Sequence, residues 1–264
     1  MEQNPHSESG DGVAGSTSPG PVPVLDEIRS FWDADAPTYD RARGHKPKDP
    51  AVVAAWAASL QHLLPPVPSR VLDVGAGTGF LSLIAARLGH DVTALDLSPQ
   101  MLERLEASAR NEDLRIRTVV GPADAPPEGF DAVMERHLLW TLPDPALALA
   151  SWRRAIPKGR LLLVESLWGG FDPVEAIRSR MVHGLRRLRK QAPDHHGSYS
   201  DSLRRRLPLS GGTPPSRLVE MAARQGWRNP RLERLRDVEW AELCELPLPE
   251  RIVGVPPRFV VVAD

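Results

Sequence analysis

The sequence lacks features that several common protein classes require. It contains one cysteine, Cys244, so neither an internal disulfide nor a cysteine-based zinc cluster can form. No apolar run approaches the roughly 18–20 residues of a membrane-spanning helix. The formal net charge of −1 provides no chain-wide basic surface for nucleic acid or anionic lipid. Residues 1–11 have no Lys, no Arg and no apolar stretch, unlike a secretory signal, so we expect a cytoplasmic protein.

The composition predicts a folded domain that follows a polar tail. Hydrophobic residues make up 41% and charged residues 25% of the 264 residues, as is typical of globular proteins. Residues 1–23 are mostly Gly, Ser, Pro and acidic residues with little to bury, so we predict a disordered tail there. Because neither an internal repeat nor a second core is evident, we expect one domain over residues 24–264.

Helix and strand signals alternate along this domain. Four pairs place a capping side chain before a proline, which is typical of helix starts: Asp49-Pro50, Ser98-Pro99, Asp144-Pro145 and Asp172-Pro173. Short β-rich runs are found at 70–74, 91–96, 116–120, 130–134 and 160–165, with a loosely alternating candidate at 231–240 and a final strand at 258–262. The alternation predicts an α/β fold in which helices cover both faces of a parallel sheet.

A glycine-rich turn follows the first of these strands. Gly75, Gly77 and Gly79 allow a sharp turn and let a ligand approach the backbone N–H groups. The next strand ends at Asp96, where a carboxylate can accept hydrogen bonds from both hydroxyls of a ribose. The pattern therefore predicts a nucleoside-containing ligand at the carboxyl ends of the strands.

A nicotinamide enzyme shares this outline but differs in two details. Its fingerprint has Gly or Ala three positions after the second glycine, where this chain has Phe80. Asp73 precedes the turn, and its negative charge would repel a pyrophosphate but suit a ligand with a positive amino group. These details favour a cationic ligand over a dinucleotide.

The motif Asp73-Val-Gly-Ala-Gly-Thr-Gly79, together with Asp96, resembles that of the class I S-adenosylmethionine-dependent methyltransferases, in their small-molecule branch. The similarity continues through residues 130–144 and 152–159 to the last strand. It implies a Rossmann-like, doubly wound sheet of seven strands in the order 3-2-1-4-5-7-6, with strand 7 antiparallel.

The resemblance also implies two segments that flank the binding site. The N-terminal helices over residues 24–66 would form a lid, in which Tyr39 and His45 close over the methionine end of the cofactor. Residues 172–215 would form a variable cap on the acceptor side.

Cofactor contacts are implied residue by residue. Asp73 and the turn at Gly75 and Gly77 would hold the methionine part of S-adenosylmethionine, and Asp96 its ribose. Side chains of Leu97 and Met101 would flank the adenine.

Recognition of the adenine amine departs from the family pattern. The family often has an acidic residue directly after a glycine that follows the third strand, whereas here that position is Pro122. Either Asp124 supplies the contact or only the backbone of Ala123 is used.

His137 is the candidate general base. It follows the fourth strand, where the family places its acceptor, and an imidazole with a pKa near 6.5 can accept a proton at working pH. An equally weighted interpretation is that His137 is not a base and merely binds a cofactor carboxylate or packs under the lid. Other expected acceptor contacts are Arg136, Trp168, Arg178 and Met181.

A basic segment lies within the predicted cap. Residues 177–207 hold nine Arg and Lys residues against two Asp residues, a local net charge of +7. Most of these side chains suit a solvated helix face, and one or two could recruit an acidic or carboxylate-bearing acceptor. Contact with another subunit or an acidic carrier protein is a third interpretation. The adjacent His195 and His196 lack a third ligand for a metal site, so no metal is predicted.

We therefore predict a methyltransferase that uses S-adenosylmethionine to methylate an O, N or, less in keeping with the pattern, C nucleophile of a small molecule in specialised metabolism. The alternatives are an RNA or protein methyltransferase and a non-catalytic, cofactor-binding regulatory subunit. Neither a nucleic-acid nor a membrane partner is expected, and the chain could act as a homodimer.

Overall fold

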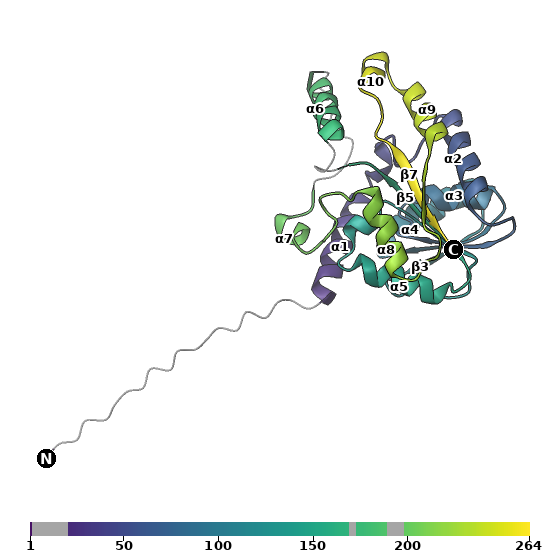
Figure 1. Ribbon diagram of the computed structural model, residues 1–264, viewed down its shortest axis with the longest axis vertical. Helices are drawn as coiled ribbons and strands as arrows, with labels where there is room; N and C mark the ends of the chain where they lie inside the picture. The colour runs from purple at the N-terminus through teal and green to yellow at the C-terminus, as the bar shows by residue number, and fades with distance from the viewer. Residues whose placement is uncertain (2–20, 169–172, 189–197) are drawn as a thin grey trace.

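The computed structural model describes residue 1 and residues 21–168, 173–188 and 198–264. Its centre is a sheet with helices packed around it (Figure 1). The sheet has seven strands in the order β3-β2-β1-β4-β5-β7-β6, which confirms the predicted order. Neighbouring strands are parallel except for β7, which runs antiparallel to both β5 and β6. The strands are β1 (Arg70–Val74), β2 (Asp91–Asp96), β3 (Ile116–Val120), β4 (Ala132–Arg136), β5 (Arg160–Ser166), β6 (Arg231–Arg234) and β7 (Arg258–Ala263).

Three of the predicted capping residues begin helices as expected. The side chains of Asp49, Ser98 and Asp144 accept backbone N–H bonds at 2.8, 3.1 and 2.9 Å, and a proline follows each. Asp172 lies outside the described residues, but a helix does begin at Pro173. The helices are α1 (Pro21–Asp35), α2 (Pro50–Leu63), α3 (Phe80–Arg87), α4 (Pro99–Asn111), α5 (Pro145–Ala155), α6 (Pro173–Leu188), α7 (Asp201–Arg204), α8 (Pro215–Arg224), α9 (Arg236–Glu245) and α10 (Leu248–Val253), with 3-10 turns at Tyr39–Arg41 and Leu139–Thr141.

Helices cover both faces of the sheet, as the alternation predicted. On one face, apolar side chains of α2, α3, α4 and α9 pack on the sheet. On the other, α5 and α8 enclose a second core around Trp152 and Trp227. Burial on both faces explains why the central strands are continuous apolar runs rather than alternating ones.

Element boundaries differ from the predictions by more than one residue in three places. The fourth strand begins at Ala132 instead of Phe130; just before its amino end, the Asp131 side chain accepts the backbone N–H of Arg70 at 2.8 Å. The strand predicted over 231–240 ends at Arg234, since the following residues form α9 and bury Val238 against α2. Helix α1 begins at Pro21, within the predicted tail; residues 2–20 lie outside the described chain.

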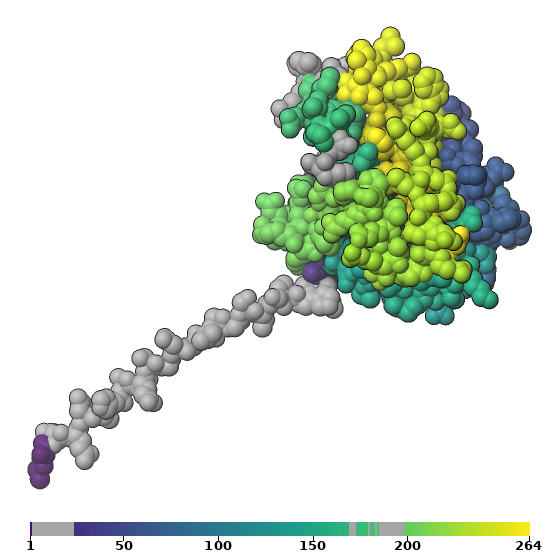
Figure 2. All heavy atoms as spheres, viewed as in Figure 1, coloured from purple at the N-terminus to yellow at the C-terminus, as the bar shows by residue number. Residues whose placement is uncertain are grey.

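Helices α1 and α6 lie outside the two helical layers that cover the sheet. Helix α1 contacts α4, where Ser98 Oγ donates to Asp33 at 2.6 Å, and its Val24 and Ile28 pack on Tyr199. Helix α6 contacts α10 and forms a separate ridge beside it (Figure 2). Within the described ranges, no helix is long and apolar enough to cross a membrane.

Candidate active site

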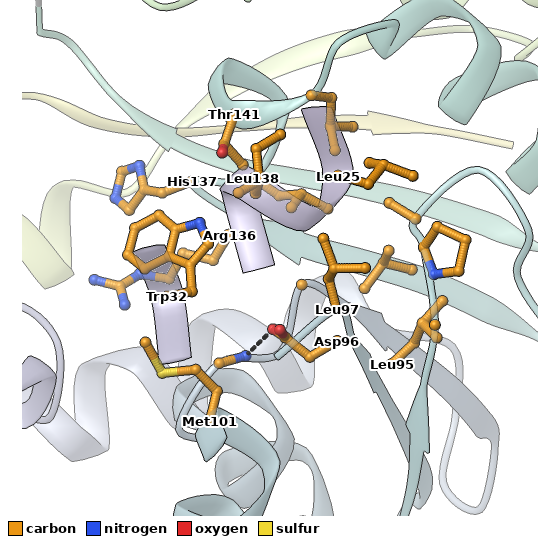
Figure 3. Close-up of a pocket in the computed structure, with 18 of the residues that line it drawn as sticks. Leu25, Trp32, Leu95, Asp96, Leu97, Met101, Arg136, His137, Leu138 and Thr141 are labelled. Atoms are coloured by element: carbon orange, nitrogen blue, oxygen red, sulfur yellow. Dashed lines mark hydrogen bonds between the residues drawn. The ribbon is translucent and has the colours of Figure 1, made fainter. Parts of the chain in front are cut away.

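A cavity opens at the carboxyl ends of β1, β2 and β4. The strand order reverses between β1 and β4, and such a switch point is where open α/β sheets bind ligands. The empty space of the cavity, including the open solvent at its mouth, is about 720 Å³. Its walls come from α1, the glycine turn, the ends of β2 and β4, and the loops after β3 and β4 (Figure 3).

The glycine turn and Asp96 form the polar floor of this cavity. The Gly77 N–H donates to Asp96 Oδ2 at 2.8 Å, a bond drawn in Figure 3, and the Ser98 N–H donates to Oδ1 at 2.8 Å. Each oxygen keeps a lone pair for a further donor. Burial raises the pKa of Asp96 to about 6, so its carboxylate is mostly ionised at neutral pH. The floor is therefore built to accept two more hydrogen bonds.

An apolar wall lies next to Asp96. Leu97, Met101 and Ala123 line it, together with Leu25 of α1. The indole N–H of Trp152 donates to the Ala123 carbonyl at 2.7 Å and fixes the loop after β3. This wall suits a flat, weakly polar group such as a nucleobase.

Arg136 lies at the opposite end of the cavity from Leu95 (Figure 3). Its guanidinium carbon is 3.9 Å from the centroid of the Phe80 ring, and it donates a hydrogen bond to the Gly44 carbonyl. Its buried Nε has no hydrogen-bond partner among the described residues. Burial and the nearby Arg258 lower its pKa to about 10, which still leaves it charged at neutral pH. A cation with an unused buried donor can receive an anionic group of a ligand.

His137 lines the same end of the cavity. Its Nδ1 lies 2.9 Å from Oε2 of Glu165, which extends from the end of β5. Burial, with Arg136 and Arg258 nearby, lowers the pKa of His137 well below its usual value, so the imidazole is neutral at pH 7. A neutral imidazole in a ligand cavity can accept a proton.

The structure brings most of the predicted site residues together. Nine of them line the cavity: Tyr39, Gly75, Gly77, Asp96, Leu97, Met101, Ala123, Arg136 and His137. Six predicted residues do not line it: His45, Asp73, Asp124, Trp168, Arg178 and Met181.

Two of those six lie just behind the cavity wall. Asp73 is buried beneath the glycine turn, where its Oδ2 accepts the Ser82 hydroxyl at 2.6 Å and burial raises its pKa to about 7. His45 stacks on Tyr39 with ring centroids 3.9 Å apart, and its Nδ1 is 2.8 Å from the Tyr39 carbonyl. Both therefore support lining residues from behind.

The predicted acceptor contacts on the cap lie farther away. Arg178 pairs with Glu175 within α6 and faces a separate groove beside α10. Met181 is half exposed. Trp168 packs edge-on against Trp140 at 5.6 Å in a small hollow that it shares with Glu165. The predicted loop histidines His195 and His196 lie outside the described residues.

Sequence reasoning missed two sources of site residues. Leu25, Ile28 and Trp32 of α1 line the cavity, although only a general lid was predicted there. The sequence predicts Glu165 only as part of a strand. Its acidic side chain near the end of an apolar strand, on the ligand side of the sheet, is the signal that could have indicated a site residue.

Known proteins are similar to this chain in sequence and in fold. A family model described as a methyltransferase domain matches residues 72–164. A ubiquinone biosynthesis O-methyltransferase of Xanthomonas campestris pv. campestris is 37% identical over 179 residues, which cover 66% of this chain and 70% of that protein. The corresponding Xanthomonas axonopodis pv. citri protein is 34% identical over 181 residues, with 66% and 70% coverage.

Solved structures show the same fold at low identity. A phosphoethanolamine N-methyltransferase 2 of Haemonchus contortus, in complex with S-adenosyl-L-methionine, superposes with a TM-score of 0.57 at 19% identity. The match covers 89% of this chain but only 59% of that longer one. The PH0226 protein of Pyrococcus horikoshii gives a TM-score of 0.54 at 13% identity, covering 86% and 97%.

The fold, the cavity at its switch point and these relatives define a class I S-adenosylmethionine-dependent methyltransferase, and the chain belongs to that family. Within it, the chain is a small-molecule methyltransferase whose cofactor is S-adenosylmethionine.

Proposed function

We propose that the protein methylates a hydroxyl group of a small aromatic acceptor and that His137 is the general base. The observation that carries this proposal is the position of His137, which lines the cavity that contains Asp96 and whose Nδ1 lies 2.9 Å from Oε2 of Glu165. A base is useful only if the acceptor has a proton to lose, which favours a hydroxyl over an amine that attacks through a free lone pair. Similarity to proteins named O-methyltransferases supports the same choice.

The aromatic side chains around His137 support a ring-shaped acceptor. Trp32, Trp140 and Tyr199 pack against one another with centroids 5.3–6.2 Å apart, and Trp32 lines the cavity. Such faces bind flat rings through offset or edge-on contacts. A role in specialised metabolism stays a prediction, as does an acceptor that carries an acidic group.

The cofactor roles follow from the lining. S-adenosylmethionine supplies a methyl group on a positively charged sulfur when it is bound. Asp96 would accept the ribose hydroxyls, because its carboxylate faces the cavity and is mostly ionised. Leu97 and Met101 would pack on the adenine, while the guanidinium of Arg136 would receive a carboxylate near Tyr39. Helix α1 would close the cavity as part of the lid.

Acceptor chemistry tests the proposal directly. The full chain is incubated with S-adenosylmethionine and matched phenol and aniline compounds, and S-adenosylhomocysteine formation is measured. We expect turnover of phenols, with a rate that rises with pH as the base becomes available. Turnover of anilines alone would contradict the O-methylation, and cofactor binding without turnover of either set would favour the non-catalytic alternative.

Substitutions at two glycines of the turn distinguish an effect on cofactor binding from an effect on stability. A Cβ at Gly77 (φ +56°) meets nothing within 4 Å, so Gly77→Ala adds only backbone strain of about 1–2 kcal/mol but fills space beside Asp96. A Cβ at Gly79 (φ +92°) would lie 2.5 Å from Cγ of the buried Leu105. We expect Gly77→Ala to weaken cofactor binding about tenfold or more with a small loss of Tm.

Gly79→Ala is the matched variant for this prediction. It should lower Tm by about 5–10 °C, since strain and overpacking add and 1 kcal/mol is worth about 2–4 °C in a chain of this size. Thermal unfolding and calorimetric titration with S-adenosylhomocysteine measure both effects. Wild-type affinity for S-adenosylhomocysteine in Gly77→Ala would show that Gly77 has no separate role in binding.

A further inference from the structure

The end of β5 places a carboxylate directly behind His137. The Glu165 side chain is only 7% exposed, and its Oε2 is 2.9 Å from His137 Nδ1. Glu165 does not line the cofactor cavity, whereas His137 does. The contact therefore occupies one ring nitrogen and leaves Nε2 as the nitrogen that can meet a ligand.

The backbone at His137 is held in an unusual conformation. Its φ of +56° lies in the left-handed region, which few residues other than glycine adopt. The His137 N–H donates to the Val164 carbonyl at 3.2 Å, and the following Leu138 N–H donates to Glu135 at 2.8 Å. Such a conformation persists where the surroundings enforce it, and it is concentrated at functional sites. Here β5 holds both the backbone and the ring of His137.

We propose that Glu165 is a positioning residue that fixes the base-competent tautomer of His137. An ionised Glu165 accepts the Nδ1–H of the ring, so the lone pair of Nε2 is free. As the acceptor O–H bond breaks, its proton passes to Nε2, and the oxygen electron pair forms the O–CH₃ bond while the methyl–sulfur bond breaks. Glu165 then stabilises the imidazolium until its proton is lost to solvent. This inference rests on the proposed function, because it assumes that the acceptor has a proton to lose.

The charges around the pair determine when this tautomer is present. Arg136 and Arg258 oppose a charge on His137, and Glu242 on α9 favours one. Burial raises the pKa of Glu165 to about 8, partly offset by the same two arginines, and burial beside Glu165 also raises the pKa of Glu135. Below this pH a protonated Glu165 donates to Nδ1, which places the ring proton on Nε2 and blocks the base. The pair titrates as a unit, so turnover should rise with pH toward 8 and above.

Glu165→Gln tests the role without removing the side chain. We expect this variant to keep its affinity for S-adenosylhomocysteine within about threefold, to lose about tenfold or more in kcat, and to lose the rise of kcat with pH. In a His137→Ala background the same change should have no further effect on kcat, because the residue it positions is gone. Glu220→Gln is the control: this exposed carboxylate on α8 pairs with Arg224 at 2.6 Å and does not line the cavity, so the variant should keep the rise.

A spectroscopic measurement separates this inference from the proposed function. In ¹⁵N NMR spectra of histidine-labelled protein with S-adenosylhomocysteine, His137, assigned by its loss in His137→Asn, should carry its proton on Nδ1 at pH 9 in the wild type and not in Glu165→Gln. That result would support the positioning role even if no phenol were turned over, in which case only the O-methylation would fail. The same tautomer in both proteins, an unchanged pH profile in Glu165→Gln, or an additive loss in the double variant would overturn the inference.

Discussion

Replacing Asp96 with alanine is expected to weaken S-adenosylmethionine binding by about 100-fold or more. The two carboxylate oxygens already accept the N–H groups of Gly77 and Ser98, and each has room for a ribose hydroxyl. Hydrogen bonds to a charged group contribute about 1.5–3 kcal/mol each, so the loss of two costs at least about 3 kcal/mol. Isothermal titration calorimetry measures the change.

Asp91→Ala is the matched control for this experiment. Asp91 begins the same strand that Asp96 ends, so it lies at the opposite end of the strand from the cavity. It is exposed and lies 3.7 Å from Arg117. Its removal should leave the dissociation constant unchanged. Thermal unfolding of Asp96→Ala must accompany the titration, because the turn loses two internal bonds. A folded Asp96→Ala protein with wild-type affinity would remove this carboxylate from the cofactor site.

Replacing His137 with alanine is expected to lower kcat by about 100-fold or more while S-adenosylhomocysteine affinity stays within about threefold. General base catalysis contributes about 10²–10⁴-fold when the acceptor must lose a proton. Alanine tolerates the left-handed backbone at φ +56° poorly, so His137→Asn is tested beside it, because asparagine adopts this conformation readily. Both variants lack a base and should be equally slow.

His62→Ala is the control for nonspecific loss of a histidine. Its side chain on α2 is 77% exposed, away from the cavity, and its removal should leave kcat unchanged. A large loss of cofactor affinity in both His137 variants would instead make His137 a binding residue. A wild-type kcat in either His137 variant would show that His137 is not the base, and that another group accepts the proton or no base is needed.

The strands and helix starts could be predicted because their signals are local. The apolar run at 160–165 and the capping pair Ser98-Pro99 each determine structure through neighbours in the chain. That the glycine turn and Asp96 form one floor of the cavity was predictable for the same reason: they end adjacent parallel strands, which places them together. Helix α9 was not, because Val238 is buried by contact with distant α2 rather than by its own neighbours.

The end of the cavity at His137 depends on contacts that the sequence does not encode locally. Glu165 reaches His137 across 28 residues, and the contact requires β4 and β5 to pair in one register. Their position in a basic segment predicts Arg178 and Met181 near the acceptor, but α6 packs on α10, where Arg178 donates to the Gly254 carbonyl at 3.3 Å and pairs with Glu175 of α6 itself. A charge pattern indicates which face of a helix is solvated, and the direction of that helix depends on tertiary packing.

We expect the carboxyl groups near the ends of β1 and β2 to affect how the protein discriminates between S-adenosylmethionine and S-adenosylhomocysteine as well. Methyl transfer removes the positive charge on sulfur. Negative surroundings therefore contribute less binding free energy to S-adenosylhomocysteine than to S-adenosylmethionine. Because burial raises the pKa of Asp73 to about 7 and that of Asp96 to about 6, these surroundings become more negative as the pH rises through neutrality. Product inhibition should therefore weaken with rising pH, and the protein should be least sensitive to accumulated product under mildly alkaline conditions.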